Sequence, residues 1–373
     1  MGQRLVAIYR IRTTAAAIAS RAAAIAVEQS VEMPVAAIDA PRILTEVVGR
    51  VEAIVDRGGG VFDARIGLAA ETVGADAGQL LNMLFGNSSL QPDVTLIGAE
   101  LPAALARRFG GPRHGIAGLR ARLGVGARAL TGSALKPQGL PADRLARLAE
   151  DFARGGIDLV KDDHGLADQD AAPFAARVPA IAQAVRRAAA TTGHPTRYAP
   201  SLSGHHGQMR AQLILAREEG LDTALLAPMV AGFAAVQALG AEFPDFAFLA
   251  HPAMGGAARI APDFLIGALF PLIGADAVIF PAHGGRFGYS AATCRGLAEA
   301  ARHPANGLRP ALPVPAGGMT LGRVSEILDF FGPDTMLLIG GSLLEAGAGL
   351  TEATARFAAA VAAHKFDRET GSP

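Results

Sequence analysis

Residues 154–169 read RGGIDLVKDDHGLADQ, and this stretch raises the main structural question of the sequence. A Gly-Gly pair leads into a short apolar run, which ends in the four ionisable residues Lys161, Asp162, Asp163 and His164. The apolar run predicts a buried strand. Charged residues directly after a strand indicate either a solvated surface turn or a catalytic or metal site at the mouth of a barrel.

The sequence around this stretch repeats regularly. From about Ala127 onward, short apolar segments alternate with amphipathic helical segments. The expected strands are ARALTGSAL, IDLVKDD, TRYAPSL, TALLAPM, FAFLAHP, AVIFPAH, LPVPAGG and MLLIGG. Eight such units over roughly 240 residues predict a C-terminal TIM (β/α)8 barrel. The competing arrangement, an open doubly wound sheet, would usually show fewer strands and a glycine-rich first turn. Barrel active sites form at the C-terminal ends of the strands, which favours the catalytic interpretation of residues 161–164.

The first hundred or so residues lack this repeat. Strand-like runs (LVAIYRI, VFDARIGLA and DVTLIGAEL) are mixed there with the helical runs AAAIASRAAAIAVEQ and AGQLLNMLF. This mixture predicts a small α+β domain of the ferredoxin-like type over residues 1–115. The barrel domain is then expected over residues 116–373.

The composition argues against several classes of protein. The 34 basic and 34 acidic side chains balance, so neither nucleic acid nor an anionic membrane is expected as the main partner. The single cysteine, Cys294, excludes a disulfide framework and is typical of a reducing cytoplasm. Arg4, Arg10 and Arg12 interrupt the apolar N-terminus, so no signal peptide is expected. No apolar run predicts a transmembrane helix. We therefore expect a soluble cytoplasmic protein.

Other predicted strands also end in residues that carry chemistry. These are Lys136 after the first strand, His251 after the fifth, and His283 and Arg286 after the sixth. Glycine pairs end the last two strands, at 317–318 and 340–341. A single pair would indicate a tight loop. Two pairs on adjacent strands favour a phosphate site formed by backbone N–H groups.

These motifs resemble, in order and spacing, the barrel motifs of the RuBisCO large subunit. The similar segments are TGSALKPQGL, GGIDLVKDDHG, LPVPAGG and LLIGG. GPRHGIAGLRARLGV resembles the domain junction of that family, and AAIAVEQS and MLFGN resemble its N-terminal segments. The resemblance covers the chain from about Ala24 to Gly341. It implies that the glycines Gly317, Gly318, Gly340 and Gly341, together with His283, bind the substrate.

The resemblance implies a divalent metal site formed by Lys161, Asp163 and His164. In the carboxylases the ligands are a carbamylated Lys, an Asp and a Glu, and His164 stands in the position of that Glu. A free lysine is a poor ligand for Mg²⁺, which prefers oxygen, whereas a carbamate formed with CO2 supplies an anionic oxygen ligand. An imidazole ligand would favour a softer ion such as Mn²⁺. His164 could instead be a proton shuttle or a surface residue.

The resemblance also implies a set of catalytic residues, namely Lys136, Lys161, His251, Arg286, Glu28 and Asn87. Lys136 could act as a general acid or base, and a structural ion pair is the alternative. Arg286 falls at the position of a mobile-loop lysine. The positions of Glu28 and Asn87 in the family reach into the barrel of the neighbouring subunit, which implies a homodimer with shared active sites.

Several residues depart from the carboxylase pattern. Pro252, Ile279 and Ala316 replace the family's second-phosphate residues, and Gln138 and Gly255 replace a lysine and a histidine. The departures resemble RuBisCO-like proteins of form IV, which do not fix CO2. Apolar walls disfavour a second dianion because its desolvation is costly. The expected activity is a metal-dependent isomerisation or enolisation of 5-methylthioribulose 1-phosphate or a related compound, as in methionine salvage.

Two other functions stay open at this stage. The first is a decarboxylase or transcarboxylase/hydrolase of a phosphorylated 3-oxo sugar acid, of the 3-oxo-isoapionate 4-phosphate type, whose carboxylate would meet Arg286 and His283. The second is a non-catalytic sugar-phosphate binding protein. A protein kept only for binding has little need of Lys161 beside Asp163, so the pair favours an enzyme.

Overall fold

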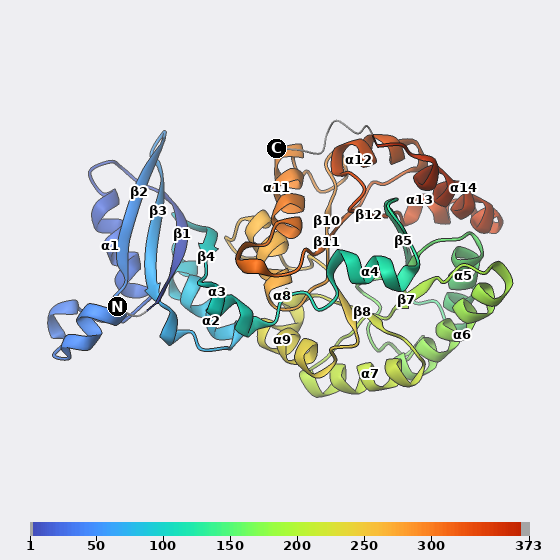
Figure 1. The fold of residues 1–373 in the computed structure, drawn as a ribbon, viewed down its shortest axis with the longest axis horizontal. Coiled ribbons are helices and arrows are strands. Elements are labelled where there is room, and N and C mark those ends of the chain that lie inside the picture. The colour runs from blue at the N-terminus through green and yellow to red at the C-terminus, as the bar shows by residue number, and fades with distance from the viewer. Residues whose placement is uncertain (1–2, 367–373) are drawn as a thin grey trace.

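A computed structural model describes residues 3–366, which form a four-stranded sheet followed by an eight-stranded barrel (Figure 1). The sheet and its helices lie beside the barrel. Among the helices of this described part, none has the length and apolar character needed to cross a membrane.

The N-terminal domain is built on a fully antiparallel sheet with the strand order β2-β3-β1-β4. Its strands are β1 (Arg4–Arg12), β2 (Arg50–Gly58), β3 (Val61–Ala69) and β4 (Val94–Glu100), and its helices are α1 (Ile18–Glu28), α2 (Ala77–Phe85) and the short α3 (Ala103–Ala106). The βαββαβ order is ferredoxin-like, so the predicted α+β fold is confirmed. Strand β2 was not predicted from the sequence. It is an edge strand and almost wholly exposed, so burial imposes no alternation on its residues.

The eight parallel strands of the barrel all fall on the predicted segments. They are β5 (Leu130–Leu135), β6 (Leu159–Asp162), β7 (Arg197–Ala199), β8 (Thr223–Leu226), β9 (Ala247–Ala250), β10 (Ala277–Pro281), β11 (Leu312–Ala316) and β12 (Met336–Leu338). Strand β12 pairs with β5, and the chain just after β7 pairs with β8 through the hydrogen bond from Leu202 N to Leu225 O, 2.8 Å. The sheet is therefore a closed TIM barrel, as predicted.

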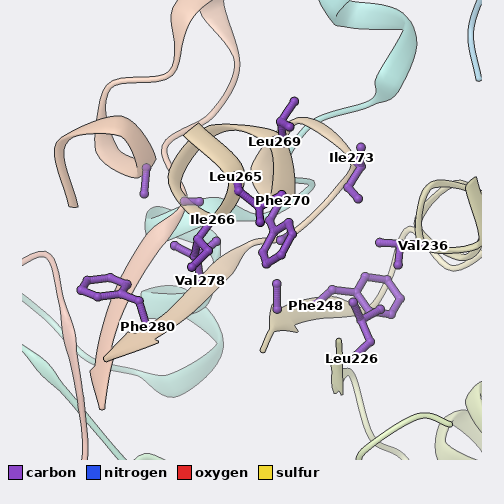
Figure 2. Packing of buried hydrophobic residues seen from close by; sticks show 14 of the residues in the cluster. Leu226, Val236, Phe248, Leu265, Ile266, Leu269, Phe270, Ile273, Val278 and Phe280 are labelled. Atoms are coloured by element: carbon purple, nitrogen blue, oxygen red, sulfur yellow. The ribbon is translucent and has the colours of Figure 1, made fainter. Parts of the chain in front are cut away.

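Helices surround the barrel as an outer ring (Figure 1). They are α5 (Ala142–Arg154), α6 (Phe174–Thr192), α7 (His206–Glu218), α8 (Pro228–Ala231), α9 (Phe233–Glu242), α10 (Phe270–Leu272), α11 (Ala291–Arg302), α12 (Val324–Phe331), α13 (Gly341–Leu344) and α14 (Leu350–Ala363). Figure 2 shows how outward-facing residues of β8, β9 and β10, such as Leu226, Phe248 and Val278, pack with the helical turns that carry Leu265 and Phe270.

A second apolar cluster fills the barrel interior. Every second residue of a strand points into the barrel. Such inward residues pack with Leu119 and Leu123 of α4 (Gly115–Leu123), and they include Leu130, Leu159 and Ala277. Because these contacts lie at the starts of the strands, α4 closes the N-terminal end of the barrel. A cavity inside the barrel can therefore open only at the C-terminal ends of the strands.

Candidate active site

A cavity of about 750 Å³ lies at the C-terminal ends of the barrel strands. Strand-end residues from six strands line it: Ala134 and Lys136 after or in β5, Lys161, Asp163 and His164 from β6, His251 after β9, Ile279 in β10, Ala316 in β11 and Leu338 in β12. Most of the residues predicted from the sequence as a site therefore line one cavity. This is the place where the βα loops of a TIM barrel form binding and catalytic sites.

The alternation of a strand separates the ionisable residues of 161–164 into two groups. Successive side chains of a strand point to opposite faces. Leu159 lies in the barrel interior and Val160 in the outer core, so Lys161 and Asp163 face the cavity and Asp162 faces the helices. The charged run is therefore neither a surface turn nor a single cluster, because Lys161 and Asp163 face the cavity and Asp162 faces the helices.

The cavity-facing residues form a compact polar cluster. Lys136 Nζ lies 2.6 Å from Asp163 Oδ1, and His164 Nδ1 lies 3.4 Å from the same oxygen. The rings of His164 and His251 are stacked, with centroids 4.0 Å apart and planes inclined by 6°. Lys161 Nζ donates to the backbone oxygen of Asp162 at 2.9 Å. One carboxylate thus organises two neighbouring cationic or imidazole groups beside the buried Lys161.

Burial shifts the protonation of this cluster. It lowers the pKa of Lys161 to about 8, an effect that the charge of Asp163 opposes and that of Lys136 reinforces. Burial would raise the pKa of Asp163, but hydrogen bonds from His164 and Lys136 outweigh it and hold that pKa well below its usual range. Burial, together with the charge of Lys161, lowers the pKa of His251 to about 2. Lys161 can thus lose its proton near pH 8, as carbamate formation requires, while His251 stays neutral.

His251 is also held in one orientation. Its Nδ1 accepts a hydrogen bond from the backbone N–H of Ala253, 3.1 Å away. A neutral imidazole that accepts at Nδ1 carries its proton at Nε2. His251 can therefore offer one N–H donor from the cavity wall.

Asp162, on the outer face of β6, anchors the segment that follows the strand. Its carboxylate accepts hydrogen bonds from Tyr198 Oη at 2.8 Å, Ser201 N at 3.0 Å and Arg177 Nε at 3.2 Å. Arg177 also donates to the backbone oxygens of Ala167 and Ala172, at 2.9 and 2.7 Å. Asp162 and Arg177 are fully buried. This ion pair ties α6 to the loop that begins with Asp163 and His164.

Replacing Arg177 with Met is expected to lower the free energy of unfolding by about 3–5 kcal/mol, because it leaves the buried Asp162 carboxylate without its cation. Arg187→Met, on the same helix, is the matched control, since Arg187 pairs with Glu150 at a surface where about half of its side chain is exposed. That change should cost no more than about 1 kcal/mol. Urea unfolding followed by circular dichroism measures both. Equal losses in the two variants would contradict the anchoring role of Arg177.

The glycine pairs form the other side of the cavity. Gly317 and Gly318 both have positive φ angles, 77° and 76°, which glycine adopts without a steric penalty. A methyl group at Gly318 would lie 3.0 Å from Gly285 Cα, so the loops after β10 and β11 pack backbone against backbone. A methyl group at Gly340 would lie 4.0 Å from Lys136 Cε. The predicted phosphate loop at Gly340 is therefore next to Lys136, the residue that follows β5.

Three predicted site residues do not line this cavity. His283 packs on Phe330 of α12, with ring centroids 4.4 Å apart, and its Nδ1 is 3.8 Å from Glu326. Gly284, with φ 67°, turns the chain directly after it. His283 was expected to bind the substrate, but it does not line the cavity, because its ring packs on Phe330 beneath the loop. Arg286, in contrast, lines the cavity as expected.

Glu28 and Asn87 lie in the N-terminal domain, away from the cavity of their own chain. Asn87 Nδ2 donates to Glu28 Oε1 and to Glu32 Oε1, at 2.9 Å in each case. The two residues are thus brought together, 59 positions apart in the sequence, but not to the barrel cavity of the same subunit.

Other cavity residues were missed in the sequence. They are Met254, Phe287, Tyr289, Met319, Thr320, Ser342 and Glu345, with Ala253, Phe280 and Pro281 at the wall. Most of them lie in βα loops within ten residues of a strand end. Only their place in these loops could have indicated them, because neither a single apolar residue nor a single hydroxyl or carboxyl group in a loop forms a motif of its own.

The residues fit a metal ion only if Lys161 is modified. Within residues 3–366, no three His, Cys, Asp or Glu side chains are grouped so that they could hold a metal. Asp163 and His164 supply two donors, and the third residue at the same wall is Lys161, whose ammonium group repels cations. A carbamate on Lys161 would convert this group into an oxygen ligand and complete the set.

The fold and the site together define a class of protein: a ferredoxin-like domain followed by a TIM barrel, with Lys and Asp at the end of the second barrel strand and glycine loops after the last two. The family model described as ribulose bisphosphate carboxylase large chain, catalytic domain, matches residues 115–266. Ribulose bisphosphate carboxylase-like protein 1 of Rhodopseudomonas palustris is 56% identical over 364 residues, which cover 98% of this chain and 99% of that protein. The 5-methylthioribulose-1-phosphate isomerase of Rhodospirillum rubrum is 57% identical over 363 residues, 97% of each chain.

Solved structures agree with the sequence relatives. The crystal structure of a Rubisco-like protein from Rhodopseudomonas palustris superposes with a TM-score of 0.92 at 50% identity, covering 99% of this chain and all of that one. The chain therefore belongs to the RuBisCO large-chain family and is a RuBisCO-like protein. The predicted resemblance is confirmed.

Proposed function

We propose that the protein is a metal-dependent isomerase of 5-methylthioribulose 1-phosphate. The observation that carries the proposal is that Pro252, Ile279 and Ala316 line the same cavity as Lys161 and Asp163. An apolar wall suits a methylthio end and disfavours a second phosphate, because burying an unpaired dianion is costly. The name of the relative that is 57% identical over nearly the whole chain supports the same substrate.

The reaction needs only proton transfer on the carbon chain of the sugar. A base removes a proton from the carbon beside the ketone, which gives an enediolate, and a proton is then delivered to the former carbonyl carbon while the adjacent hydroxyl becomes the new carbonyl. No electron acceptor is needed. A divalent ion held by carbamylated Lys161, Asp163 and His164 would polarise the substrate oxygens and make that C–H acidic.

The positions of the side chains support roles for the remaining residues. Lys136, paired with Asp163 and next to Gly340, is the candidate acid or base, because it stands between the proposed metal ligands and a phosphate loop. His251 offers its Nε2–H to a substrate oxygen. Arg286, on the loop after β10, lines the cavity and would contact a bound anion. The phosphate would accept backbone N–H groups near Gly318, Gly340 and Gly341.

The proposal predicts carbonyl migration with retention of the phosphate. Purified protein with Mg²⁺ and CO2 should convert 5-methylthioribulose 1-phosphate in D2O into an isomer that carries solvent deuterium on the sugar chain, as followed by ¹H and ³¹P NMR. Ribulose bisphosphate with labelled bicarbonate should give no labelled acid-stable product. Consumption without an isomeric product, or labelled product from the bisphosphate, would rule out the assignment.

The decarboxylase alternative has less support in the geometry. It expected both Arg286 and His283 to meet the substrate carboxylate, whereas His283 packs against Phe330 outside the cavity. A single cation at that wall leaves the carboxylate of a sugar acid with fewer partners. We therefore keep the isomerase as the proposed function.

We further propose that the active site is completed between two subunits by Glu28 and Asn87. The pair is preformed in the N-terminal domain but does not reach its own cavity. A Glu28→Gln protein and a Lys161→Ala protein should each be inactive. In an equimolar mixture that exchanges subunits at random, half of the dimers are hybrids with one intact site of two, so about a quarter of wild-type activity should return. Each variant mixed with itself is the control, and absence of recovery after proven exchange would indicate self-contained sites.

A further inference from the structure

The mouth of the cavity exposes a large apolar side chain. Met254, in the loop after β9, lines the cavity and is 60% exposed. A ligand that enters the cavity can cover this side chain, since binding cavities bury most of the surface of their ligands. Its neighbours Pro252 and Ala253 line the same wall and carry no polar side chain. The side chains of residues 252–254 thus offer no group that could pair with an anion.

The backbone at Met254 is unfavourable for a side chain. Gly255 N donates to Pro252 O at 2.9 Å, which closes a turn with Met254 at its third position and a φ of 63°. In residues 3–366, Glu32 is the one other non-glycine residue with a positive φ. Turns with positive φ at this position favour glycine, because a side chain there is strained. Since Met254 is mostly exposed, packing in the folded chain does not offset that strain.

The turn is nevertheless fixed relative to the reacting groups. The backbone N–H of Ala253 donates to His251 Nδ1 at 3.1 Å, and Ala257 N donates to Met254 O at 3.0 Å. The ring of His251 in turn stacks on His164. These hydrogen bonds connect the turn that carries Met254 to the polar cluster. A strained residue that is held in place at a site indicates that its side chain has a function.

We propose that Met254 determines substrate specificity by covering the apolar end of the substrate, and that this end is a thioether or alkyl group. The inference rests on the proposed function and deepens it, because it assigns the residue that selects the tail. A methionine side chain is flexible and polarisable and adapts its shape to such a group. It offers no strong donor to a hydroxyl or a phosphate. A tail that ends in a hydroxyl or a phosphate would lose its hydration at this wall without gaining a hydrogen-bond partner.

The test uses two non-reacting ligands with the same head and different tails. These are 5-methylthioribitol 1-phosphate and ribitol 1-phosphate, whose dissociation constants are measured by calorimetry for the wild type and for Met254→Gly, Met254→Leu and Val230→Ala. Val230 is 67% exposed and does not line the cavity, so it is the matched control. Thermal midpoints without ligand and the dimer dissociation constant are measured on the same samples.

Met254→Gly should weaken the thioether ligand about tenfold, in line with the apolar area that the side chain would bury, and should leave ribitol 1-phosphate almost unchanged. Its thermal midpoint should stay equal or rise, because glycine relieves the positive φ. Met254→Leu and Val230→Ala should keep the preference for the thioether.

The measurements distinguish failure of the proposed function from failure of the role assigned to Met254. If the wild type does not prefer the thioether ligand, the proposed function fails. If the wild type prefers it and Met254→Gly keeps that preference, or weakens both ligands equally, the role of Met254 fails while the proposed function stands. A changed dimer dissociation constant with unchanged selectivity would place Met254 in a subunit interface and would also overturn the inference.

Discussion

Lys161→Ala is expected to abolish the isomerase activity, with a loss of at least about a thousandfold, the range that loss of a central acid–base or metal-binding group produces. The side chain is 2% exposed and faces the cavity beside Asp163. Without the amine there is no carbamate, and Asp163 and His164 alone are too few ligands to hold a divalent ion in place. Initial rates with and without EDTA measure both the loss and its link to the metal.

The small number of lysines makes this prediction sharp. The chain has three, Lys136, Lys161 and Lys365. Lys365 lies exposed near the end of the described chain, so Lys365→Ala is the matched control and should keep full activity. With ¹³CO2 and Mg²⁺, the wild type and Lys365→Ala should each show one carbamate signal by ¹³C NMR, and Lys161→Ala none. Activity that survives both EDTA and the loss of Lys161 would contradict the proposed metal site.

Pro252→Arg is expected to weaken binding of a methylthio-ended monophosphate by about a hundredfold, because the bound tail would bury a guanidinium without a partner. The same change should improve the relative binding of a bisphosphate, whose second phosphate can pair with the new cation. Inhibition constants for a matched monophosphate and bisphosphate in both proteins give the ratio. Pro252→Ala, which removes the ring without adding charge, should move that ratio little.

A ratio that does not change in Pro252→Arg would mean that Pro252 does not face the substrate. The assignment of the methylthio end to this wall would then lose its main physical basis. A loss of both ligands to the same degree would point instead to a disturbed turn, since Pro252 O accepts the hydrogen bond from Gly255 N. Unfolding curves of Pro252→Ala and Pro252→Arg separate this case from a direct effect of charge.

Local patterns in the sequence were sufficient to predict the strands of the barrel and many of the residues that line its cavity. Short apolar segments at regular intervals predicted all eight strands, and each strand end faces the same mouth, because parallel strands in a barrel share one direction. Lys136, Lys161, His251 and Arg286 could therefore be expected in one cavity before their contacts were known, and they line it. Strand β2 escaped prediction because an exposed edge strand need not alternate.

Contacts between segments far apart in the chain decided which of the predicted residues join the site and which side chains contact one another. Whether Asp162 joins the site depended on strand alternation together with α6, whose Arg177 neutralises that carboxylate outside the barrel. The ring of His283 does not line the cavity, because it packs on Phe330, which lies 47 positions later in the chain. The stacking of His164 on His251 likewise joins two different strand ends. The sequence by itself determined which residues reach the mouth of the barrel, since strand direction and period are local properties. Only the tertiary structure decided which of them face one another, because side-chain partners are chosen by packing and desolvation across the whole fold.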